Sequence, residues 1–288
     1  MTRRMKAALV TVFALLLAVV LVTAGLSFVG NANWMSNGFS RQLFASVPVL
    51  GPWNQLYEKK IDRSFTVADH KPIFFASSLG DVTVSQGAGK RVEVLTTAGF
   101  GGFSATSAEA QARLYQLNAV DTPTGLHLSL GNSAGISGLH KVAIQLIVPV
   151  HAALQVVESM GNVNVSGDFK TLQVQDNMGN INVNGNVANS MTLGDDMGNI
   201  FYQGDPGQSS RMTNNMGNVA IFLVGKRALQ VAATTDLGNI SGELGQFSVQ
   251  TAHHWSGSTG SAKGATKAGS MSVYDHLGNI TINEVNNG

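Results

Sequence analysis

The chain of 288 residues contains no cysteine and few charges. The lack of cysteine excludes a disulfide framework, a thiolate zinc site, a catalytic thiol and a lipid-modified cysteine. Charged residues make up 12% of the sequence and the formal net charge is +1, so no basic excess attracts a phosphate backbone. The composition therefore argues against a nucleic-acid partner, and we expect stability to come from apolar packing and backbone hydrogen bonds.

Glycine and apolar residues are abundant instead. The sequence holds 33 glycines, and 44% of its residues are hydrophobic. This combination is typical of a β protein that is rich in turns and has a sizeable core.

The N-terminus has the pattern of a membrane anchor. A basic tail at residues 1–6 precedes residues 7–29, which carry no charge and exceed the roughly 20 residues that a bilayer-spanning helix needs. Basic residues stay on the cytoplasmic side, so the rest of the chain is expected outside the cytoplasm. The sequence predicts a single-pass inner-membrane protein with a periplasmic or extracellular C-terminal domain. A cleaved signal peptide, with Val22-Thr23-Ala24 at the cleavage site, is the alternative.

Residues 30–64 are predicted to form an aromatic connector next to the membrane. Aromatic residues beyond a membrane span often sit at the level of the lipid headgroups. A short helix packed on the following domain would explain the same spacing. The apolar residues at helical spacing are Phe39 and Leu43, and Trp53, Leu56 and Tyr57.

From residue 65 to residue 288 the pattern predicts a single β domain with one inserted helix. Apolar residues alternate at 92–95, 126–130 and 142–148, as they do in half-buried strands. Between the first two of these segments, Thr106 and Glu109 have the spacing of a capping box, and the residues that follow suit a helix of about three turns.

The domain repeats one short motif. Copies read MGNVNVSG at 160–167, MGNINVNG at 178–185, MGNIFYQG at 197–204, MGNVAIF at 216–222, LGNISGELG at 237–245 and LGNITIN at 277–283, with an isolated first copy, LGDVTV, at 79–84. From Gly161 onward the motif glycines are 18, 19, 19, 21 and 40 residues apart. The last step equals two periods, and a degenerate copy is expected near Gly257.

Each unit supplies two short strands that cannot bury their apolar faces alone. An apolar pair two residues apart precedes each motif and another usually follows it, for example Leu172/Val174 and Ile181/Val183. Stacking the units about 4.8 Å apart pairs each strand with its copies and closes an apolar interior. The sequence therefore predicts an all-β fold, a parallel β-solenoid (β-helix) with two strands per rung of about 19 residues.

The motif residues are assigned to the corner of each rung. The glycine suits a corner that needs a positive φ, and the asparagine after it can bond to the copies beside it. Met160, Met178, Met197 and Met216 are expected to fill the interior beneath the turn, as are the leucines at the equivalent positions. The polar tail, 284–288, is expected to cover the end of the coil weakly, which predicts end-to-end assembly.

Strands ending in proline (VAIQLIVP), followed by ALQVVESMGNVNVSG and further G-N-[IV]-x-[IV] copies, give the chain a family resemblance. Residues 65 to 285 resemble the bacterial putative-adhesin domain, also called the toast-rack family. The resemblance implies a β-solenoid of the cell envelope whose biochemical function is unknown. The asparagines and Asp81 fit the family pattern, and the unit around Gly257 departs from it.

Three positions before each motif glycine lies a polar column. Stacked carboxylates at Glu158, Asp176 and Asp195 would repel one another, which favours either raised pKa values or a bound hard cation such as calcium. The alternative is that the column bonds to the turn backbone and faces water. We favour the second interpretation and expect no metal site. The column consists of Glu158, Asp176, Asp195, Asn214, Thr235 and Asp275.

Two other groups are considered as sites. His253, His254 and Trp255 could form a sugar-stacking or metal-binding spot, but we favour a loop inserted in the solenoid. Asp195, Asp196 and Arg211 are the only nearby set that a polysaccharide-active enzyme could use.

The sequence shows no cofactor motif, no nucleophile elbow and no complete phosphate-binding loop, since Val84 stands where GAGKR at 87–91 would need its first glycine. We predict a non-catalytic binding, adhesion or scaffold module with a protein or an envelope polymer as partner. The alternatives are an envelope-stress sensor or signalling partner of a membrane protein and, last, a polysaccharide-active β-helix enzyme.

Overall fold

The computed structural model describes residues 55–69, 71–131, 138–225, 227–244, 246–259 and 268–285. The predicted anchor and most of the predicted connector, including Phe39 and Leu43, lie outside these residues. Among the helices that the structure describes, none has both the length and the apolar character needed to cross a membrane.

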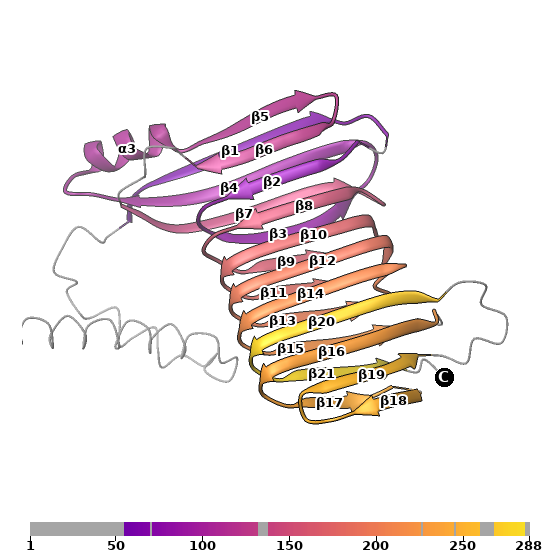
Figure 1. Cartoon of the computed structure of the whole chain (residues 1–288). Coiled ribbons are helices and arrows are strands. Elements are labelled where there is room, and N and C mark those ends of the chain that lie inside the picture. Colours follow the sequence, from indigo (N-terminus) through magenta and orange to yellow (C-terminus); the bar gives the residue numbers. More distant parts are fainter. Residues whose placement is uncertain are drawn as a thin grey trace, which may run out of the picture. The chain divides into compact units, whose positions relative to one another are not determined.

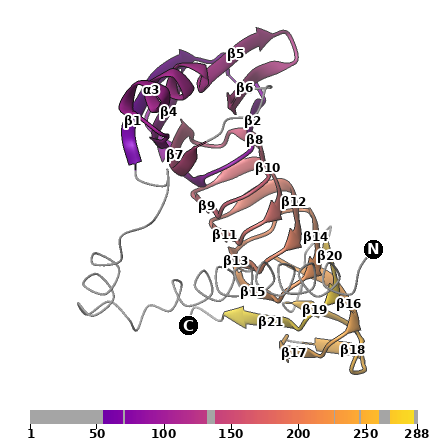
Figure 2. The same ribbon diagram turned by 90° about the vertical axis from the view of Figure 1, so that its left-hand side faces the viewer.

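The described residues form two large sheets, here called sheet A and sheet B (Figure 1). Figure 2 shows the two sheets on opposite sides of the stack. Sheet A has the order β1 (Gln55–Thr66), β4 (Arg91–Gly101), β7 (Leu139–Pro149), β3 (Asp81–Gly87), β9 (Val163–Ser166), β11 (Ile181–Asn184), β13 (Ile200–Gly204), β15 (Val219–Val224), β21 (Ile280–Val285), β17 (Ile240–Glu243). Sheet B has the order β18 (Gln246–Gln250), β19 (His254–Thr259), β16 (Leu229–Leu237), β20 (Gly269–Leu277), β14 (Ser209–Met216), β12 (Val187–Met197), β10 (Phe169–Met178), β8 (Ala153–Glu158), β2 (Ile73–Ser77), β6 (Gly125–Gly131), β5 (Gln116–Thr122).

The predicted stacking of copies is confirmed in the central rungs. Each rung is a strand of sheet B, a glycine corner and a strand of sheet A, and corresponding residues pair in parallel register, such as Leu172 with Leu154 and Met191. The alternating apolar residues point inward and are buried, for example Ile181 at 0% exposure. The isolated first copy also joins this stack, because β3 pairs in parallel with β9. Burial between the two sheets supplies the apolar core that no single rung could close.

The last copy in the sequence does not lie at the end of the stack. β20 lies between β14 and β16 in sheet B, and β21 lies between β15 and β17 in sheet A. The C-terminal rung is thus inserted between two rungs that are adjacent in sequence. The prediction that the polar tail covers the end is wrong, since Glu284 belongs to this inserted rung.

The predicted degenerate copy near Gly257 is also wrong. Gly257 lies in β19, which pairs antiparallel with both β16 and β18. This hairpin covers the outer edge of β16 in sheet B, and Trp255 of β19 is buried at 1% exposure. The hairpin thus takes the place that a next parallel strand would occupy beside β16.

Trp255 is expected to hold this hairpin on the stack. Replacing a buried Trp by Ala removes a large apolar contact, so Trp255→Ala should lower the unfolding free energy by about 3–5 kcal/mol. We expect a lower melting temperature and faster proteolysis within 246–259, together with self-association through the uncovered β16 edge in light scattering. His254→Ala, which changes an exposed neighbour, serves as the control. Unchanged proteolysis in Trp255→Ala would contradict this role.

The boundary predicted at residue 65 is wrong by ten residues. β1 begins at Gln55 and pairs antiparallel with β4, so residues 55–64 belong to sheet A. The helical spacing of Trp53, Leu56 and Tyr57 therefore does not reflect a helix at Tyr57, which lies on β1.

The inserted helix is confirmed, with a different cap. α3 spans Ala105–Leu114 and buries Ala108 and Ala112. Its capping box joins Ser104 and Ser107, whose side chains each bond to the other residue's backbone N–H. Glu109 instead bonds to Arg113 one turn later, at 2.9 Å.

The corner methionines do not fill the interior. Met160, Met178, Met197 and Met216 are 40–44% exposed, and Leu237 and Leu277 are exposed as well. The alternation of buried and exposed residues breaks between the polar column and the glycine, which turns these side chains outward. Of the predicted interior plugs, only Leu79 packs against the core.

The corners need glycine mainly because the backbones of successive rungs approach closely, and less because of the backbone conformation. Gly161 and Gly217 have φ of 145° and 141°, within the range that favours glycine. At Gly179 and Gly198, however, a Cβ would overlap the carbonyl oxygen of the glycine in the preceding rung. The row of corner glycines, here called the glycine file, thus lets successive corners approach more closely than a side chain at these positions would allow.

Candidate functional site

The corner asparagines form a continuous hydrogen-bonded ladder along one edge of the stack. Asn180 donates its backbone and side-chain N–H groups to Asn162 Oδ1, at 3.2 and 2.9 Å, and the same contact recurs from rung to rung. Asp81 accepts from Asn162 at the first rung. The ladder confirms the predicted role of these residues. It joins Asp81, Asn162, Asn180, Asn199, Asn218, Asn279 and Asn239, in that order.

The polar column lies inside the stack and does not face water. Glu158, Asp176 and Asp275 are 0% exposed and Asp195 is 2% exposed, so the prediction of a solvent-facing column is wrong. The carboxyl groups of Glu158 and Asp195 accept backbone N–H groups of their own turns, as Met197 N–H bonds to Asp195 Oδ1 at 3.2 Å. Other carboxyl oxygens, including both of Asp176, have no hydrogen-bond partner among the described residues.

Burial raises the pKa of each acid in this column. The pKa of Glu158 and of Asp195 rises to about 7, and that of Asp176 and of Asp275 to about 6. Desolvation is the main cause at all four positions, because taking a charge out of water disfavours the ionised form. The negative charge of Asp176 adds to the effect at Asp195, while the backbone N–H of Met197 opposes it.

The uncharged members of the column carry a hydrogen-bond donor, as a protonated carboxyl group would. Asn214 Nδ2 donates to the carbonyl oxygen of Gly198 in the adjacent rung at 3.2 Å, and Thr235 Oγ1 donates to the carbonyl oxygen of Gly278 at 3.1 Å. Asp195 Oδ2 occupies the same place next to the corner glycine of its rung and has no donor. A protonated carboxyl group can donate to the neighbouring carbonyl, and an ionised one cannot.

The described residues contain no group of three His, Cys, Asp or Glu side chains arranged to hold a metal ion. The column places one carboxyl group per rung in single file, in parallel register. This geometry suits hydrogen bonds along the stack, such as those that Asn214 and Thr235 form.

The other two predicted groups are separated by the fold. Trp255 is buried, whereas His253 and His254 are exposed, so the three do not form one surface. Asp195 is buried and its neighbour Asp196 is exposed. Arg211 pairs in register with Thr192, three residues from the Asp195 position and on an outward-facing site.

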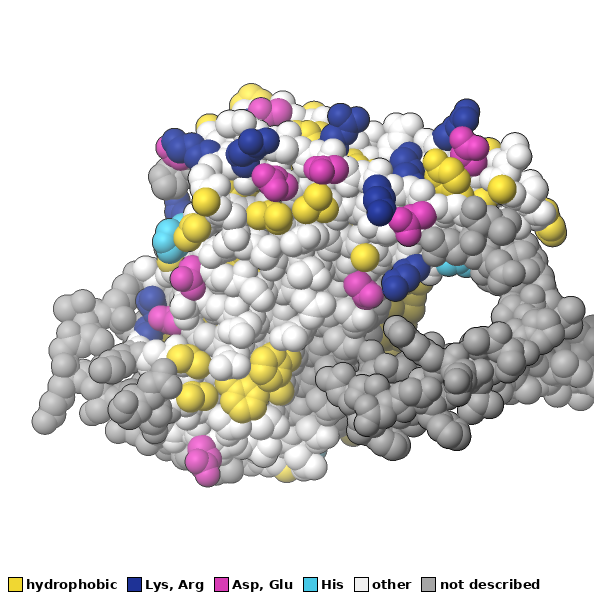
Figure 3. Space-filling view, turned by 180° about the vertical axis from the view of Figure 1, so that it is seen from behind, with side chains coloured by type: hydrophobic (Ala, Val, Ile, Leu, Met, Phe, Trp, Pro, Cys, Tyr) yellow, Lys and Arg dark blue, Asp and Glu magenta, His cyan; other side chains and the backbone are white. Residues whose placement is uncertain are grey.

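A surface that the sequence interpretation missed lies on the outside of sheet A. The outward side chains of the four central strands are uncharged, and we call this set the amide face (Figure 3). Charged side chains gather instead toward β1 and β4 at one end of the sheet, and hydrophobic side chains gather lower on the face. The amide face comprises Asn164, Ser166, Asn182, Asn184, Phe201, Gln203, Ala220, Phe222 and Val224.

Two phenylalanines form the apolar part of the amide face. The rings of Phe201 and Phe222 lie 5.5 Å apart between centroids, tilted by 40°. Phe201 is opposite Ala220 in the pairing of β13 with β15, and the small side chain leaves room for the Phe222 ring two residues further along. Phe201 and Phe222 stand at outward positions where the preceding copies carry Asn or Ser and Gln, and this departure from the repeat is a signal in the sequence.

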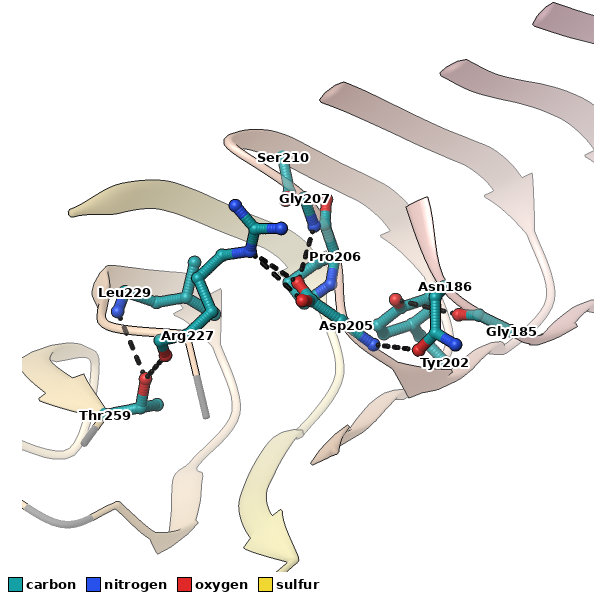
Figure 4. A network of polar contacts seen from close by, with 10 residues as sticks. All are labelled: Gly185, Asn186, Tyr202, Asp205, Pro206, Gly207, Ser210, Arg227, Leu229 and Thr259. Carbon is teal, nitrogen blue, oxygen red and sulfur yellow. Dashed lines mark hydrogen bonds and ion pairs between the residues drawn. The ribbon is translucent and has the colours of Figure 1, made fainter. Parts of the chain in front are cut away.

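A second polar network fixes the turns beside this face (Figure 4). Asp205 N–H donates to Asn186 Oδ1 at 3.0 Å, and Arg227 Nε donates to both Asp205 carboxylate oxygens at 2.9 and 3.1 Å. Tyr202, buried behind the face, donates its hydroxyl to the Gly185 carbonyl at 3.1 Å. These bonds join three rungs and hold the strands of the amide face in register.

No family model and no curated protein matches the chain. Its fold is similar to solved structures described as a putative cell adhesion protein from Clostridium sporogenes (TM-score 0.49, 11% identity, 79% of this chain and 100% of that chain) and a putative adhesin from Bacteroides fragilis (0.37, 15%, 79% and 97%). Another is described as a putative lipid binding protein, from Parabacteroides distasonis (0.32, 11%, 79% and 97%).

Proposed function

We propose that the protein is a non-catalytic binding module of the bacterial cell envelope, anchored by residues 7–29 and presenting its solenoid outside the cytoplasm. The observation that supports this most is the amide face, a broad uncharged surface on a stack of rungs locked by asparagine and aspartate bonds. Parallel rungs give a long regular surface and rigidity, which suits recognition of an extended partner.

Retention of envelope material tests this function. Full-length protein in detergent micelles should retain isolated bacterial envelope fragments, and its solenoid should be cleaved by a protease added outside intact spheroplasts. A solenoid protected from external protease, or a folded protein that retains no fragments, would contradict the proposal.

The enzyme alternative predicts a different result with the same material. Retained fragments should release no new reducing ends and no unsaturated sugars. Release that disappears in Asp195→Asn would show that a carboxyl group of the column takes part in catalysis, and would overturn the assignment of a non-catalytic module.

A further inference from the structure

We propose that the amide face binds an uncharged polysaccharide, with sugar rings stacked on Phe201 and Phe222. This inference rests on the proposed function and names the chemical class of its partner.

The first argument is charge. None of the outward side chains on β9, β11, β13 and β15 is ionisable, although β1 and β4 of the same sheet carry Lys60, Asp62 and Arg91. Anionic polymers, acidic peptides and lipid headgroups are recognised mainly by cationic side chains, which this face lacks. An uncharged partner needs no ion pair and is therefore not penalised by the lack of cations.

The second argument is the hydrogen bonding of the side-chain amides. Corner asparagines are bonded within their ladder, whereas the side chains of Asn164, Asn182 and Asn184 form no hydrogen bond to any described residue. Each free amide offers two N–H donors and a carbonyl acceptor. Sugar hydroxyl groups both donate and accept, so a row of free amides matches them better than it matches an apolar ligand.

The third argument is the aromatic pair. A pyranose ring has an apolar C–H face, and burying that face on an aromatic ring removes both surfaces from water. Phe201 and Phe222 are half-buried and next to one another, so their rings are held in place by the sheet and by each other. Amides beside a fixed aromatic platform provide the two kinds of contact that a sugar chain needs.

The outer face of sheet B is less suited. Its Phe74 stacks on His127 at 4.4 Å between ring centroids and 6° between planes, so one face of the ring is already covered. Glutamine and threonine side chains surround this ring in a groove of about 250 Å³. Phe74 therefore provides a matched control, a half-buried outward phenylalanine on the opposite sheet.

Titration of full-length protein in micelles with cellohexaose and chitohexaose, two uncharged β-1,4-linked oligosaccharides, tests the proposal by calorimetry. We expect binding of at least one of them, weakened about tenfold or more in Phe201→Ala and in Phe222→Ala, since removal of a central aromatic contact typically costs more than 1 kcal/mol. Phe201→Tyr keeps the ring and should bind nearly as wild type, as should Phe74→Ala. Circular dichroism verifies that each variant is folded.

Three results would overturn the proposal. Folded wild-type protein that binds neither oligosaccharide is the first. Binding that survives both Phe→Ala changes, or that is lost in Phe74→Ala instead, is the second. Preference for polygalacturonate, an anionic polymer, is the third. Envelope fragments retained equally by wild type and by Phe201→Ala/Phe222→Ala would refute this inference and leave the proposed binding function standing, whereas a lack of retention by wild type would refute that function.

Discussion

Asp195→Asn is expected to make the protein more stable at about pH 8. Burial raises the pKa of Asp195 from 3.8 to about 7, so the folded state holds a proton that the unfolded chain has already released. A raised carboxyl pKa stabilises the fold fully below about pH 4, and this stabilisation is lost as pH rises toward 7 and does not return above it. Since one pKa unit corresponds to about 1.4 kcal/mol, the loss at this one position is on the order of 4 kcal/mol.

Asparagine imitates the protonated acid at this position. Its amide can donate to the Gly179 carbonyl in the way that Asn214 donates to Gly198. Thermal unfolding should therefore show Asp195→Asn more stable than wild type by about 2–4 kcal/mol at about pH 8, with the difference falling within about 1 kcal/mol at about pH 4. Wild type itself should melt at a higher temperature at about pH 5 than at about pH 8, because four acids of the column act in the same direction.

Asp196→Asn is the matched control. It removes the same formal charge from an exposed neighbour whose carboxylate accepts from Asn215 Nδ2 at 2.8 Å. The charge of Asp196 contributes to the raised pKa of Asp195, so a small gain at high pH is expected, well below that of Asp195→Asn. Equal effects of the two substitutions, or a wild type whose stability rises between about pH 5 and 8, would show that the buried column is ionised at little cost.

The sequence predicts correctly which residues of the column align with one another. It does not predict that the column is buried. Asp176 pairs with Asp195 in register, as the repeat predicts. Its burial follows from period-two alternation, since Leu172, Val174 and Asp176 have the same parity and face inward together. The prediction of a solvent-facing column rests on the general preference of aspartate for exposed turns. The alternation of inward and outward residues along the strand predicts the burial of Asp176 correctly.

The order of the rungs could not be predicted from the repeat. The copies present nearly the same glycine, asparagine and apolar pairs to their neighbours, so the motif does not specify which copy lies next to which. The 40-residue step is equally compatible with a missing rung and with a hairpin that folds back, as β18 and β19 do. Long-range pairing of β20 with β14 decides the order, and no local pattern encodes it.

The amide face was missed for a related reason. The repeated motif consists mainly of corner residues and inward positions, whereas Phe201 and Phe222 are outward residues that break the repeat. Their contact depends on the register of β13 with β15, in which Phe201 pairs with Ala220. The register of the two strands places these two phenylalanines next to each other on one surface.

Gly198→Ala is expected to cause the largest loss of stability among single changes at the corners. A Cβ at this position would overlap the Gly179 carbonyl oxygen, a backbone atom that can move only with its whole rung, and would also come within 2.6 Å of Asp195 Oδ2. Separating the rungs would weaken the bond from Gly198 N–H to the Met216 carbonyl, now 2.9 Å, and open the core beneath. We expect a loss of more than about 3 kcal/mol, at the upper end of single-substitution effects.

Gly225→Ala distinguishes overlap from backbone strain. Gly225 has φ of 133°, which an L side chain rarely adopts, yet the nearest atom to a Cβ there lies 3.7 Å away. Its substitution should cost only the strain of that conformation, about 1–2 kcal/mol. The φ of Gly198 lies outside the left-handed range, so the stability lost in Gly198→Ala reflects overlap alone. Denaturant unfolding of both variants, with hydrogen exchange at Ile200 and Val219, should show local loss of protection only in Gly198→Ala. If the two variants lose equal stability, conformational strain and not the close stacking of rungs explains the glycine file.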